Sequence, residues 1–418
     1  MKIALNTPAR KRLVGGIAIV FAGMYLLLAA RLLIATWLGG RVELKSLQRA
    51  AWLDPSNADF RDHLGRYYDL VVRDPATATG YYRAAVQLNP HSARFWFDLA
   101  SAYQVLGDTP NQTGSLEHAI AADSMTPDVA WEAANLYLVQ GQNEKALHEF
   151  RVVMANDSSL AASAIQFCWR IDPDVDALLR DVVPEDANAY VAFLSLLETK
   201  HETAGTFKVW NALIRSGQPF EVRDVYDYVQ YLVKHKEVDE AVLVWQQSVG
   251  RFGLSAYLPT SANLVVNPTF SLDVINGGFD WQYGKQSGVT LTLDPSDFHA
   301  GRRSLLIAFD GPGIDDAGIY QYIPLQPSTT YDFSAYYKNG QIEGAGGPHF
   351  TIQDMYSQAV YYESDELKEA GYWKSVDGEF TTPADCKLVV LHVRRLPAGS
   401  PIRGKLWIDD FRLSRKPS

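Results

Sequence analysis

The residues best suited to chemistry are aromatic rings in the C-terminal third of the chain. An exposed Trp or Tyr ring flanked by polar groups can stack against the C–H face of a sugar, while amides and carboxylates bind its hydroxyls. Six residues are candidates for such a site: Trp281, Tyr283, Tyr356, Tyr361, Tyr362 and Trp373. Adjacent strand residues face opposite ways, so at least one of Tyr361 and Tyr362 should be exposed. The competing interpretation of each ring is core or loop packing, which is also the expectation for Trp407.

Carboxylates near these rings offer polar contacts in two clusters, Asp315-Asp316 and Glu363-x-Asp365-Glu366, although solvated loop charge is the alternative. Motifs of nucleophilic, phosphate-binding, redox or zinc chemistry are absent from the sequence, and its nine His residues are scattered. A glycosidase needs two carboxylates across a cleft. The 48 acidic residues leave that alternative open, but no stretch is left over for a catalytic domain, so we predict a protein that is not an enzyme.

A membrane-spanning segment is predicted near the N-terminus. Leu13 to Ala30 carries no charge, and the apolar run continues from Leu32 to Leu38 after Arg31. About 20 apolar residues are enough to cross the hydrocarbon core of a bilayer. The Arg31 side chain is expected to extend toward one interface.

The charges around this segment predict its orientation. The residues before the segment include four basic ones and no acidic one: Lys2, Arg10, Lys11 and Arg12. The basic residues that follow the segment are Arg41, Lys45 and Arg49, and the acidic Glu43 lies among them. The positive-inside rule then predicts a single pass through the inner (cytoplasmic) membrane, a cytoplasmic N-terminus and a periplasmic or otherwise extracytoplasmic bulk. The alternative is a signal peptide cleaved at the small residues Leu28-Ala29-Ala30.

A 34-residue period follows the predicted anchor. Ala51, Ala85 and Ala119 share this spacing, as do Gly107 and Gly141. A period of this length indicates a solenoid of helical hairpins, each of which buries its apolar face against its neighbours.

The repeat resembles the tetratricopeptide repeat (TPR), whose Trp-x-x-Leu-Gly-x-x-Tyr helix meets a second helix at small residues. The units that carry the resemblance run from His63 to Pro90, from Phe95 to Ile120 and from Trp131 to Val153, the first of them one residue out of step. Leu53-Asp54-Pro55 and Leu88-Asn89-Pro90 are the expected breaks between units, because Pro disfavours helix at the residue before it. After a polar break at 181–187, further hairpins are predicted over 189–210 and 226–245. The resemblance implies a groove that binds a protein partner.

The pattern changes after residue 262 to strand-like alternation. Strands are expected at 289–293, 304–309, 318–322, 331–337, 349–353, 387–393 and 405–413, with turns at 311–313 and 344–348. Several short strands separated by turns indicate a sandwich of two antiparallel sheets.

This region resembles the carbohydrate-binding modules of the family 4/9/22 type, which are β-jelly rolls. The matching segments occur in the same order: Asn267 to Phe270, His299 to Leu305, Tyr320 to Pro327, Thr329 to Tyr336 and Leu406 to Leu413. The resemblance implies a glycan partner and a structural Ca²⁺ held in part by a carboxylate, for which Asp409 is the candidate. The family often has Glu after the opening Phe, where this chain has Ser271, and one acidic pair is not by itself a calcium site.

Together these patterns predict a multidomain chain: an N-terminal tail and transmembrane helix over 1–42, an all-α TPR-like solenoid over 43–255 and an all-β jelly-roll sandwich over 262–418. A net charge of −10 and a pI near 5.4 make nucleic acid an unsuitable partner. Cys168 and Cys386 fall in different predicted domains, so they are either two buried thiols or an interdomain bridge. The function expected is an exported, anchored scaffold that binds a protein and a glycan, with bacterial exopolysaccharide assembly or secretion as its setting. A scaffold without glycan binding is the alternative, and a cryptic glycoside hydrolase is a weaker one.

Overall fold

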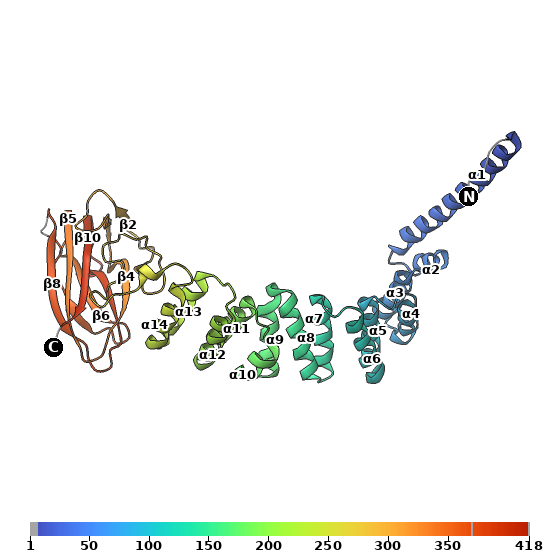
Figure 1. The fold of residues 1–418 in the computed structure, drawn as a ribbon, viewed down its shortest axis with the longest axis horizontal. Helices are drawn as coiled ribbons and strands as arrows, with labels where there is room; N and C mark the ends of the chain where they lie inside the picture. The colour runs from blue at the N-terminus through green and yellow to red at the C-terminus, as the bar shows by residue number, and fades with distance from the viewer. Residues whose placement is uncertain (1–6, 369–370, 417–418) are drawn as a thin grey trace. The chain divides into compact units, whose positions relative to one another are not determined.

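The computed structural model describes residues 7–368 and 371–416, and its internal contacts divide the chain into two compact units (Figure 1). Unit 1 is Met1–Pro219 and is helical, whereas unit 2 is Phe220–Ser418 and joins two helices to two β-sheets. Lys2, which the orientation argument counts, lies outside the described residues.

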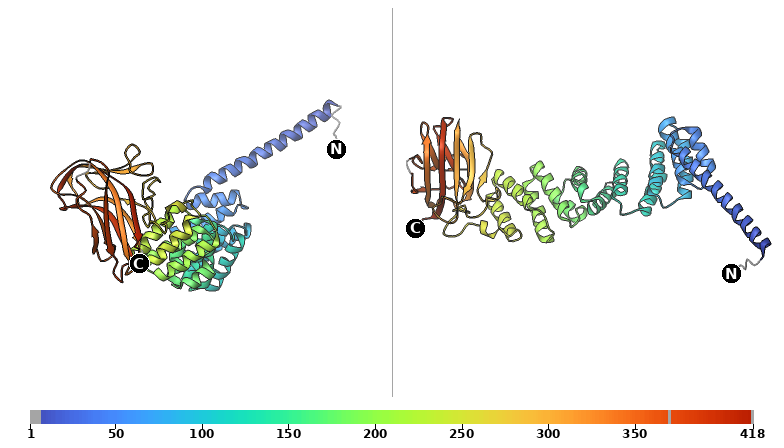
Figure 2. Two further views of the ribbon diagram at one scale, coloured as in Figure 1. Left: turned by 60° about the vertical axis from the view of Figure 1, so that its left-hand side comes forward. Right: turned by 90° about the horizontal axis from the view of Figure 1, so that it is seen from above.

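Unit 1 is a succession of helices, and helices that follow one another in the chain pack side by side (Figures 1 and 2). Its α-helices are α1 (Pro8–Gly39), α2 (Leu44–Leu53), α3 (Ala58–Arg66), α4 (Pro75–Leu88), α5 (Ala93–Leu106), α6 (Thr109–Ala122), α7 (Pro127–Val139), α8 (Asn143–Asn156), α9 (Ala161–Ile171), α10 (Val175–Ala177), α11 (Ala187–Lys200) and α12 (Thr203–Ser216). Helix α1 is long and apolar enough to cross a membrane, a test that a signal sequence would also pass.

The 34-residue period is confirmed as a packing period. Ala51, Ala85 and Ala119 are buried on α2, α4 and α6. Gly107 and Gly141 follow α5 and α7 with φ of 73° and 71°, the left-handed conformation that glycine adopts without strain and that ends a helix. The expected breaks hold as well, since α2 and α4 end at Leu53 and Leu88.

A π-helical turn explains why the first repeat is one residue out of step. The chain continues from α3 into the π-helix η1 (Tyr67–Val72), whose wider turn takes up one more residue than an α-helical turn. The helix pair still closes tightly, because Gly65 lies against Tyr82: a Cβ at this position would be 2.5 Å from the tyrosine ring. A second π-helix, η3 (Leu178–Val182), lies just before α11, where the polar break was predicted.

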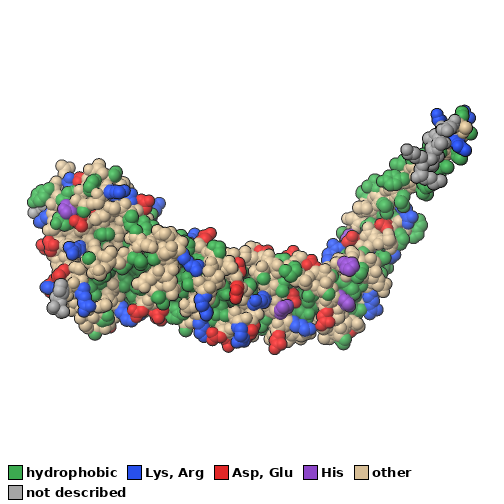
Figure 3. Space-filling view, viewed as in Figure 1, with side chains coloured by type: hydrophobic (Ala, Val, Ile, Leu, Met, Phe, Trp, Pro, Cys, Tyr) green, Lys and Arg blue, Asp and Glu red, His purple; other side chains and the backbone are tan. Residues whose placement is uncertain are grey.

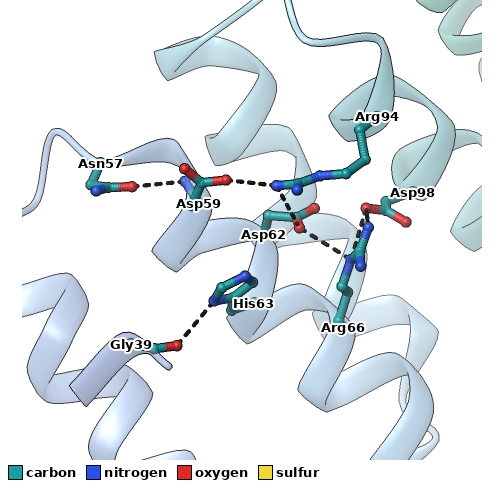
Figure 4. A network of polar contacts seen from close by, with 8 residues as sticks. All are labelled: Gly39, Asn57, Asp59, Asp62, His63, Arg66, Arg94 and Asp98. Carbon is teal, nitrogen blue, oxygen red and sulfur yellow. Dashed lines mark hydrogen bonds and ion pairs between the residues drawn. The ribbon is translucent and has the colours of Figure 1, made fainter. Parts of the chain in front are cut away.

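A network of charged side chains joins the first two repeats (Figure 4). Arg66 on α3 lies 3.1 Å from the buried Asp62 and 2.6 Å from Asp98 on α5. Arg94 on α5 reaches back to Asp59 at 2.6 Å and to Asp62 at 3.6 Å. Burial and the nearby Asp98 carboxyl raise the pKa of Asp62, while the Arg66 and Arg94 guanidinium groups act in the opposite direction.

The β part of unit 2 is a sandwich of two five-stranded antiparallel sheets (Figures 1 and 2). The first sheet has the order β1-β4-β9-β6-β7, and the second has the order β2-β3-β10-β5-β8. Their bounds are β1 (Gln282–Tyr283), β2 (Val289–Asp294), β3 (Ser304–Gly313), β4 (Asp316–Pro324), β5 (Thr330–Glu343), β6 (Gly347–Asp354), β7 (Val360–Glu363), β8 (Lys374–Thr381), β9 (Leu388–Leu396) and β10 (Pro401–Arg415). The predicted all-β jelly-roll class is confirmed.

The three strands that were not predicted all lie at sheet edges. β1 and β7 are short, and β8 carries charged and polar residues on a largely exposed strand. Edge strands are often short or charged because this discourages pairing with other chains, and the same features hide them from sequence patterns. The predicted turn at 311–313 is wrong, since these residues extend β3.

The last helical hairpin belongs to unit 2. Helices α13 (Val222–Lys234) and α14 (Val238–Val249) pack against the segment before β1. A Cβ at Gly277 would lie 2.5 Å from the Tyr226 ring, and one at Gly278 would lie 2.6 Å from the Trp245 ring. Trp245 also donates its Nε1–H to the Tyr257 carbonyl at 3.2 Å. The helical hairpin and the sandwich therefore share one packed interface.

A buried carboxyl beside this interface predicts how the stability of unit 2 depends on pH. Asp280 is 0% exposed; its Oδ2 accepts from the Ile275 N–H, and its Oδ1 has no hydrogen-bond partner in the described part of the chain. Burial raises the pKa of Asp280 to about 7, and that of Asp409 to about 6. The folded unit thus holds these protons more tightly than the unfolded chain. We expect its free energy of unfolding to fall between about pH 4 and pH 7, by about 4 kcal/mol for Asp280 alone.

Calorimetry of the full chain at pH 5 and pH 8 checks this expectation. The transition of unit 2 should occur at a lower temperature at pH 8, and Asp280→Asn should remove most of the difference. Asp310→Asn, at an exposed position of the same unit, is the matched control and should leave the difference intact. A transition that is higher at pH 8 than at pH 5 would contradict the assignment.

Candidate functional site

A cleft on the outer face of the first sheet is the best candidate for a ligand site. Its volume is about 380 Å³, and it crosses β4, β9 and β6, the central strands of this sheet. It is lined by Gly284, Lys285, Gln286, Asp316, Gly318, Tyr320, Tyr322, Gln353, Met355, Gln358, Val390 and His392.

Two tyrosine rings form the aromatic part of the cleft. Tyr320 and Tyr322 alternate with the buried Ile319, Gln321 and Ile323, so both rings leave β4 on its outer face. Their centroids are 5.2 Å apart and their planes are inclined by 62°. Tyr320 donates its hydroxyl to Gln282 at 3.2 Å, which fixes that ring. Burial and the adjacent Tyr320 hydroxyl raise the pKa of Tyr322, so this phenol is a neutral donor at ordinary pH.

A carboxylate held in a fixed orientation lies beside the rings. Asp316 accepts the Gly318 N–H at 2.7 Å through Oδ1 and lies 2.7 Å from Nδ1 of His392 through Oδ2. Since a carboxylate only accepts, the His392 Nδ1–H is the donor. Each carboxylate oxygen keeps a further lone pair, with which Asp316 can accept a hydrogen bond from a ligand hydroxyl.

Amide groups complete the polar lining. Gln353 donates to Gln358 at 2.8 Å, and Gln358 in turn donates to the Met355 carbonyl at 2.8 Å. Gln286 comes from the segment after β1 and is exposed. Aromatic faces beside amides, one carboxylate and one ammonium group are the combination that binds a sugar chain by stacking and by hydroxyl hydrogen bonds.

The hairpin α13–α14 supports one end of the cleft. Tyr356 lies between the lining residues Met355 and Gln358 and donates its hydroxyl to the Val233 carbonyl of α13 at 2.7 Å. The Lys236 ammonium lies 5.5 Å from the centre of the Tyr356 ring. Tyr356 was predicted to bind a ligand directly, but in the structure its hydroxyl is engaged by the hairpin. Its ring fixes the loop that carries two lining residues.

The structure contradicts the prediction that Trp281 binds a ligand. Its side chain is 1% exposed and packs 5.1 Å from the Phe270 ring and 4.9 Å from the Phe411 ring, measured between centroids. Its Nε1–H donates to the Asn267 carbonyl at 3.2 Å. Because no face of this ring reaches the surface, Trp281 is a core residue.

Tyr283 lines a different hollow. It is 50% exposed and faces a cavity of about 620 Å³ at the open edge of the sandwich, where β1 and β2 end their sheets. The segment 284–286 borders both this cavity and the cleft. The edge cavity is walled mainly by β2 and has a single aromatic ring, so its chemistry fits a sugar less well than that of the cleft.

Tyr361 and Tyr362 lie on the edge strand β7 and are both half-buried. Tyr361 donates to Asp354 at 3.1 Å, and Tyr362 packs 5.2 Å from the Phe333 ring in the sandwich core. Trp373 lies by the second sheet, where its Nε1–H donates to Asp297 at 3.2 Å. The predicted aromatic residues are therefore not gathered at one site.

Trp407 also differs from its expected place in the core. Its side chain is half-buried, its Nε1–H donates to Asp294 at 2.8 Å, and the Lys338 ammonium lies 5.8 Å from its ring centre.

The tyrosines of the cleft were missed as ligand residues, although a signal was present in the sequence. The order Tyr320-Gln321-Tyr322 inside a predicted strand puts two rings on one face and a polar residue between them. The acidic pair at 315–316 was noted as a source of polar contacts, and Asp316 does line the cleft. Gln353 and His392 carried no local signal.

The surroundings of Asp409 do not fit a calcium site. Its Oδ2 accepts the N–H groups of His299 and Ala300 at 2.8 and 2.9 Å, and its Oδ1 accepts the Asp410 N–H at 2.8 Å. Three N–H donors thus surround this carboxylate, whereas a calcium ion would need several further oxygen ligands beside it. In the part of the chain that the structure describes, no group of three or more His, Cys, Asp or Glu side chains is placed to hold a metal.

We therefore expect calcium to leave the stability of unit 2 unchanged. A specific ion at about 100 times its Kd would add about 2.7 kcal/mol to the free energy of unfolding, which raises Tm by several degrees. Thermal unfolding in EDTA and in CaCl₂, with MgCl₂ as the control for ionic strength, should give the same Tm within about 1 °C. A rise specific to calcium would show that a site forms around Asp409 after all.

The two cysteines are free and buried, one on α9 and one just before β9. Burial raises the pKa of Cys168 to about 12 and that of Cys386 to about 11. Thiols of this kind are poor nucleophiles, so neither is a candidate for catalysis.

Comparison with known proteins supports the assignment of the sandwich. Residues 262–397 match the family model described as a carbohydrate binding domain, which confirms the resemblance of the β region. A comparison with curated protein sequences gives no match.

Similar solved structures include both kinds of domain. One described as "CBM4 structure and function" is 18% identical and covers 36% of this chain and 99% of that one, with a TM-score of 0.29. The CBM22-1 xylan-binding domain of Paenibacillus barcinonensis Xyn10C is 14% identical over 36% of this chain and 92% of that one (TM-score 0.25). A TPR protein of Thermus thermophilus is 20% identical over 29% of this chain and 70% of that one (TM-score 0.27).

Proposed function

We propose that this protein is a membrane-anchored, non-enzymatic scaffold that binds a glycan through the outer face of its first sheet and a protein partner through its helical unit. The cleft carries the first half of this proposal. Tyr320, Tyr322 and the oriented Asp316 lie together inside the region that matches a carbohydrate binding domain. Both kinds of domain found in the chain are non-catalytic kinds, which supports binding as the activity.

The helical unit supports the second half. Stacked hairpins present grooves along which an extended peptide or a helix can bind. One hollow in unit 1, of about 730 Å³, lies near α10, η3 and α12 and has charges of both signs, among them Asp176, Arg180, Lys208 and Arg215. A partner with a polar, mixed-charge segment suits this surface.

The proposed glycan binding is tested with the full chain in detergent. Affinity electrophoresis through gels that contain xylan, β-glucan, laminarin, alginate or cellulose derivatives should retard the chain in at least one polymer. An absence of retardation in every polymer would favour the alternative of a scaffold that binds protein alone. Release of reducing sugar from any of them would instead support a glycoside hydrolase.

The anchor and the setting need separate tests. We propose that α1 crosses the inner membrane with its N-terminus in the cytoplasm and that both units lie outside it. A reporter that is active only in the periplasm, fused after Gly40, should be active, and a silent reporter would reverse the orientation. An anchored glycan-binding scaffold suits the assembly or secretion of a bacterial exopolysaccharide. Deletion of the gene should then reduce the secreted polymer, and a variant that lacks both tyrosine rings of the cleft should not restore it.

A further inference from the structure

Helix α2 packs against the end of the apolar helix α1. The turn after α1 brings α2 back beside it, with Ala35 and Gly39 of α1 buried. A Cβ at Gly39 would lie 2.2 Å from the Phe60 ring of α3, so this end of α1 is part of the folded unit. The Nε–H of Arg31 donates to the carbonyl of Leu53, the last residue of α2.

This hydrogen bond fixes the level of α2 relative to the apolar segment. Arg31 is the first charged residue after Leu13 to Ala30, a stretch that spans about 27 Å as a helix. That length is close to the thickness of the hydrocarbon core, so in a spanning helix Arg31 lies at the bilayer surface. The C-terminal end of α2 then lies at the same surface.

The exposed face of α2 has the composition of a membrane-surface helix. Trp52 is 77% exposed, although it directly precedes the residue that touches Arg31. Lys45, Gln48 and Arg49 share its exposed face at helical spacing, while Ala50 and Ala51 face the protein. Figure 3 shows the apolar surface of α1, which this end of unit 1 adjoins.

We propose that the Lys45–Arg49–Trp52 face of α2 binds the surface of a bilayer that contains anionic phospholipids. This inference rests on the proposed anchoring by α1. Trp52, next to the level of Arg31, suits the boundary between acyl chains and headgroups, where Trp is enriched. Arg49 lies about one helical turn and Lys45 about two turns from Trp52, so they suit the phosphate level and the water beyond it. The contact through α2 attaches unit 1 to the membrane at a second place, in addition to α1, and so fixes the direction in which unit 1 leaves the membrane.

A spin label at Gln48 tests the contact in the full chain. Gln48→Cys is labelled with a nitroxide in vesicles of phosphatidylcholine with about 30 mol % phosphatidylglycerol. The control label is at Glu144→Cys, an exposed position of α8. The unsubstituted chain gives the background from Cys168 and Cys386, which are buried. Accessibility of the label to the water-soluble relaxant Ni(II)EDDA should be about threefold lower at position 48 than at 144.

A charge-reversal variant tests whether contact with anionic lipid causes the reduced accessibility at position 48. Lys45→Glu with Arg49→Glu and Trp52→Ser should restore the accessibility of position 48 to that of position 144. The matched control, Lys200→Glu with Arg170→Glu, makes the same change of charge at two other exposed positions of unit 1 and should have no effect.

Three results would overturn the proposal. The first is equal accessibility at both positions in a chain that floats with the vesicles, which contradicts the α2 contact and leaves the anchor intact. The second is protection at position 48 that persists in detergent without lipid, which shows that protein covers the face. The third is failure of the chain to float, which contradicts the anchor and the contact together.

Discussion

Replacing Tyr322 with alanine is expected to weaken glycan binding by roughly tenfold to a hundredfold, or about 1.5–3 kcal/mol of binding free energy. The ring lines the cleft on β4, opposite Val390 of β9, so its removal takes away a stacking surface rather than one hydrogen bond. Titration calorimetry with the polymer that gives the strongest retardation measures the change. Tyr322→Phe keeps the ring and should retain most of the affinity.

Variants at the other aromatic positions locate the site. Tyr320→Ala should also reduce the affinity, and the double variant should bind no better than the weaker single one. Trp373→Ala, beside the second sheet, and Tyr283→Ala, at the edge cavity, are the matched controls. If one of these control variants lost binding while Tyr322→Ala kept it, the glycan site would lie at the surface that carries the control residue.

Trp245→Ala is expected to lower the free energy of unfolding of unit 2 by about 3–5 kcal/mol. The ring is buried between α14 and the Gly277-Gly278 segment, in close contact with the backbone there, so its removal leaves a large cavity. Because the helical hairpin and the sandwich share this interface, the loss should reach the strands. Hydrogen–deuterium exchange of the full chain should show faster exchange in β4 and β9 as well as in α13 and α14.

Trp210→Ala is the matched control, since Trp210 is buried on α12 in unit 1. It should accelerate exchange in neighbouring helices and leave the strand amides unchanged. If Trp245→Ala likewise affected only helical amides, the hairpin would be an independent element, and its role in supporting the cleft through Tyr356 would be wrong.

Much of the fold could be predicted from local patterns. The alanine and glycine spacing identified the helical hairpins, because a helix pair needs small residues where it crosses and a left-handed residue where its first helix ends. Alternation identified the central strands, whose inner residues must be apolar. The edge strands β1, β7 and β8 were missed, since they bury too little to carry that alternation.

The site was much harder to predict. Aromatic residues are common in both cores and binding surfaces, so composition could not separate Trp281, which fills the core, from Tyr322, which lines the cleft. The pairing of Tyr322 with Val390, and of His392 with Thr351, brings together strands far apart in the sequence. Nothing local to any one of these strands specifies that pairing.

The sequence by itself determined which segments are helices or strands, the apolar helix at the N-terminus and the two kinds of domain. These properties depend on periodicity and on residues near one another in the chain. Only the tertiary structure decided which rings are exposed, that the last helical hairpin packs with the sandwich, and that the donors around Asp409 are amides. Those features depend on which distant surfaces meet when apolar area is buried, and this is settled by the packing of the whole unit.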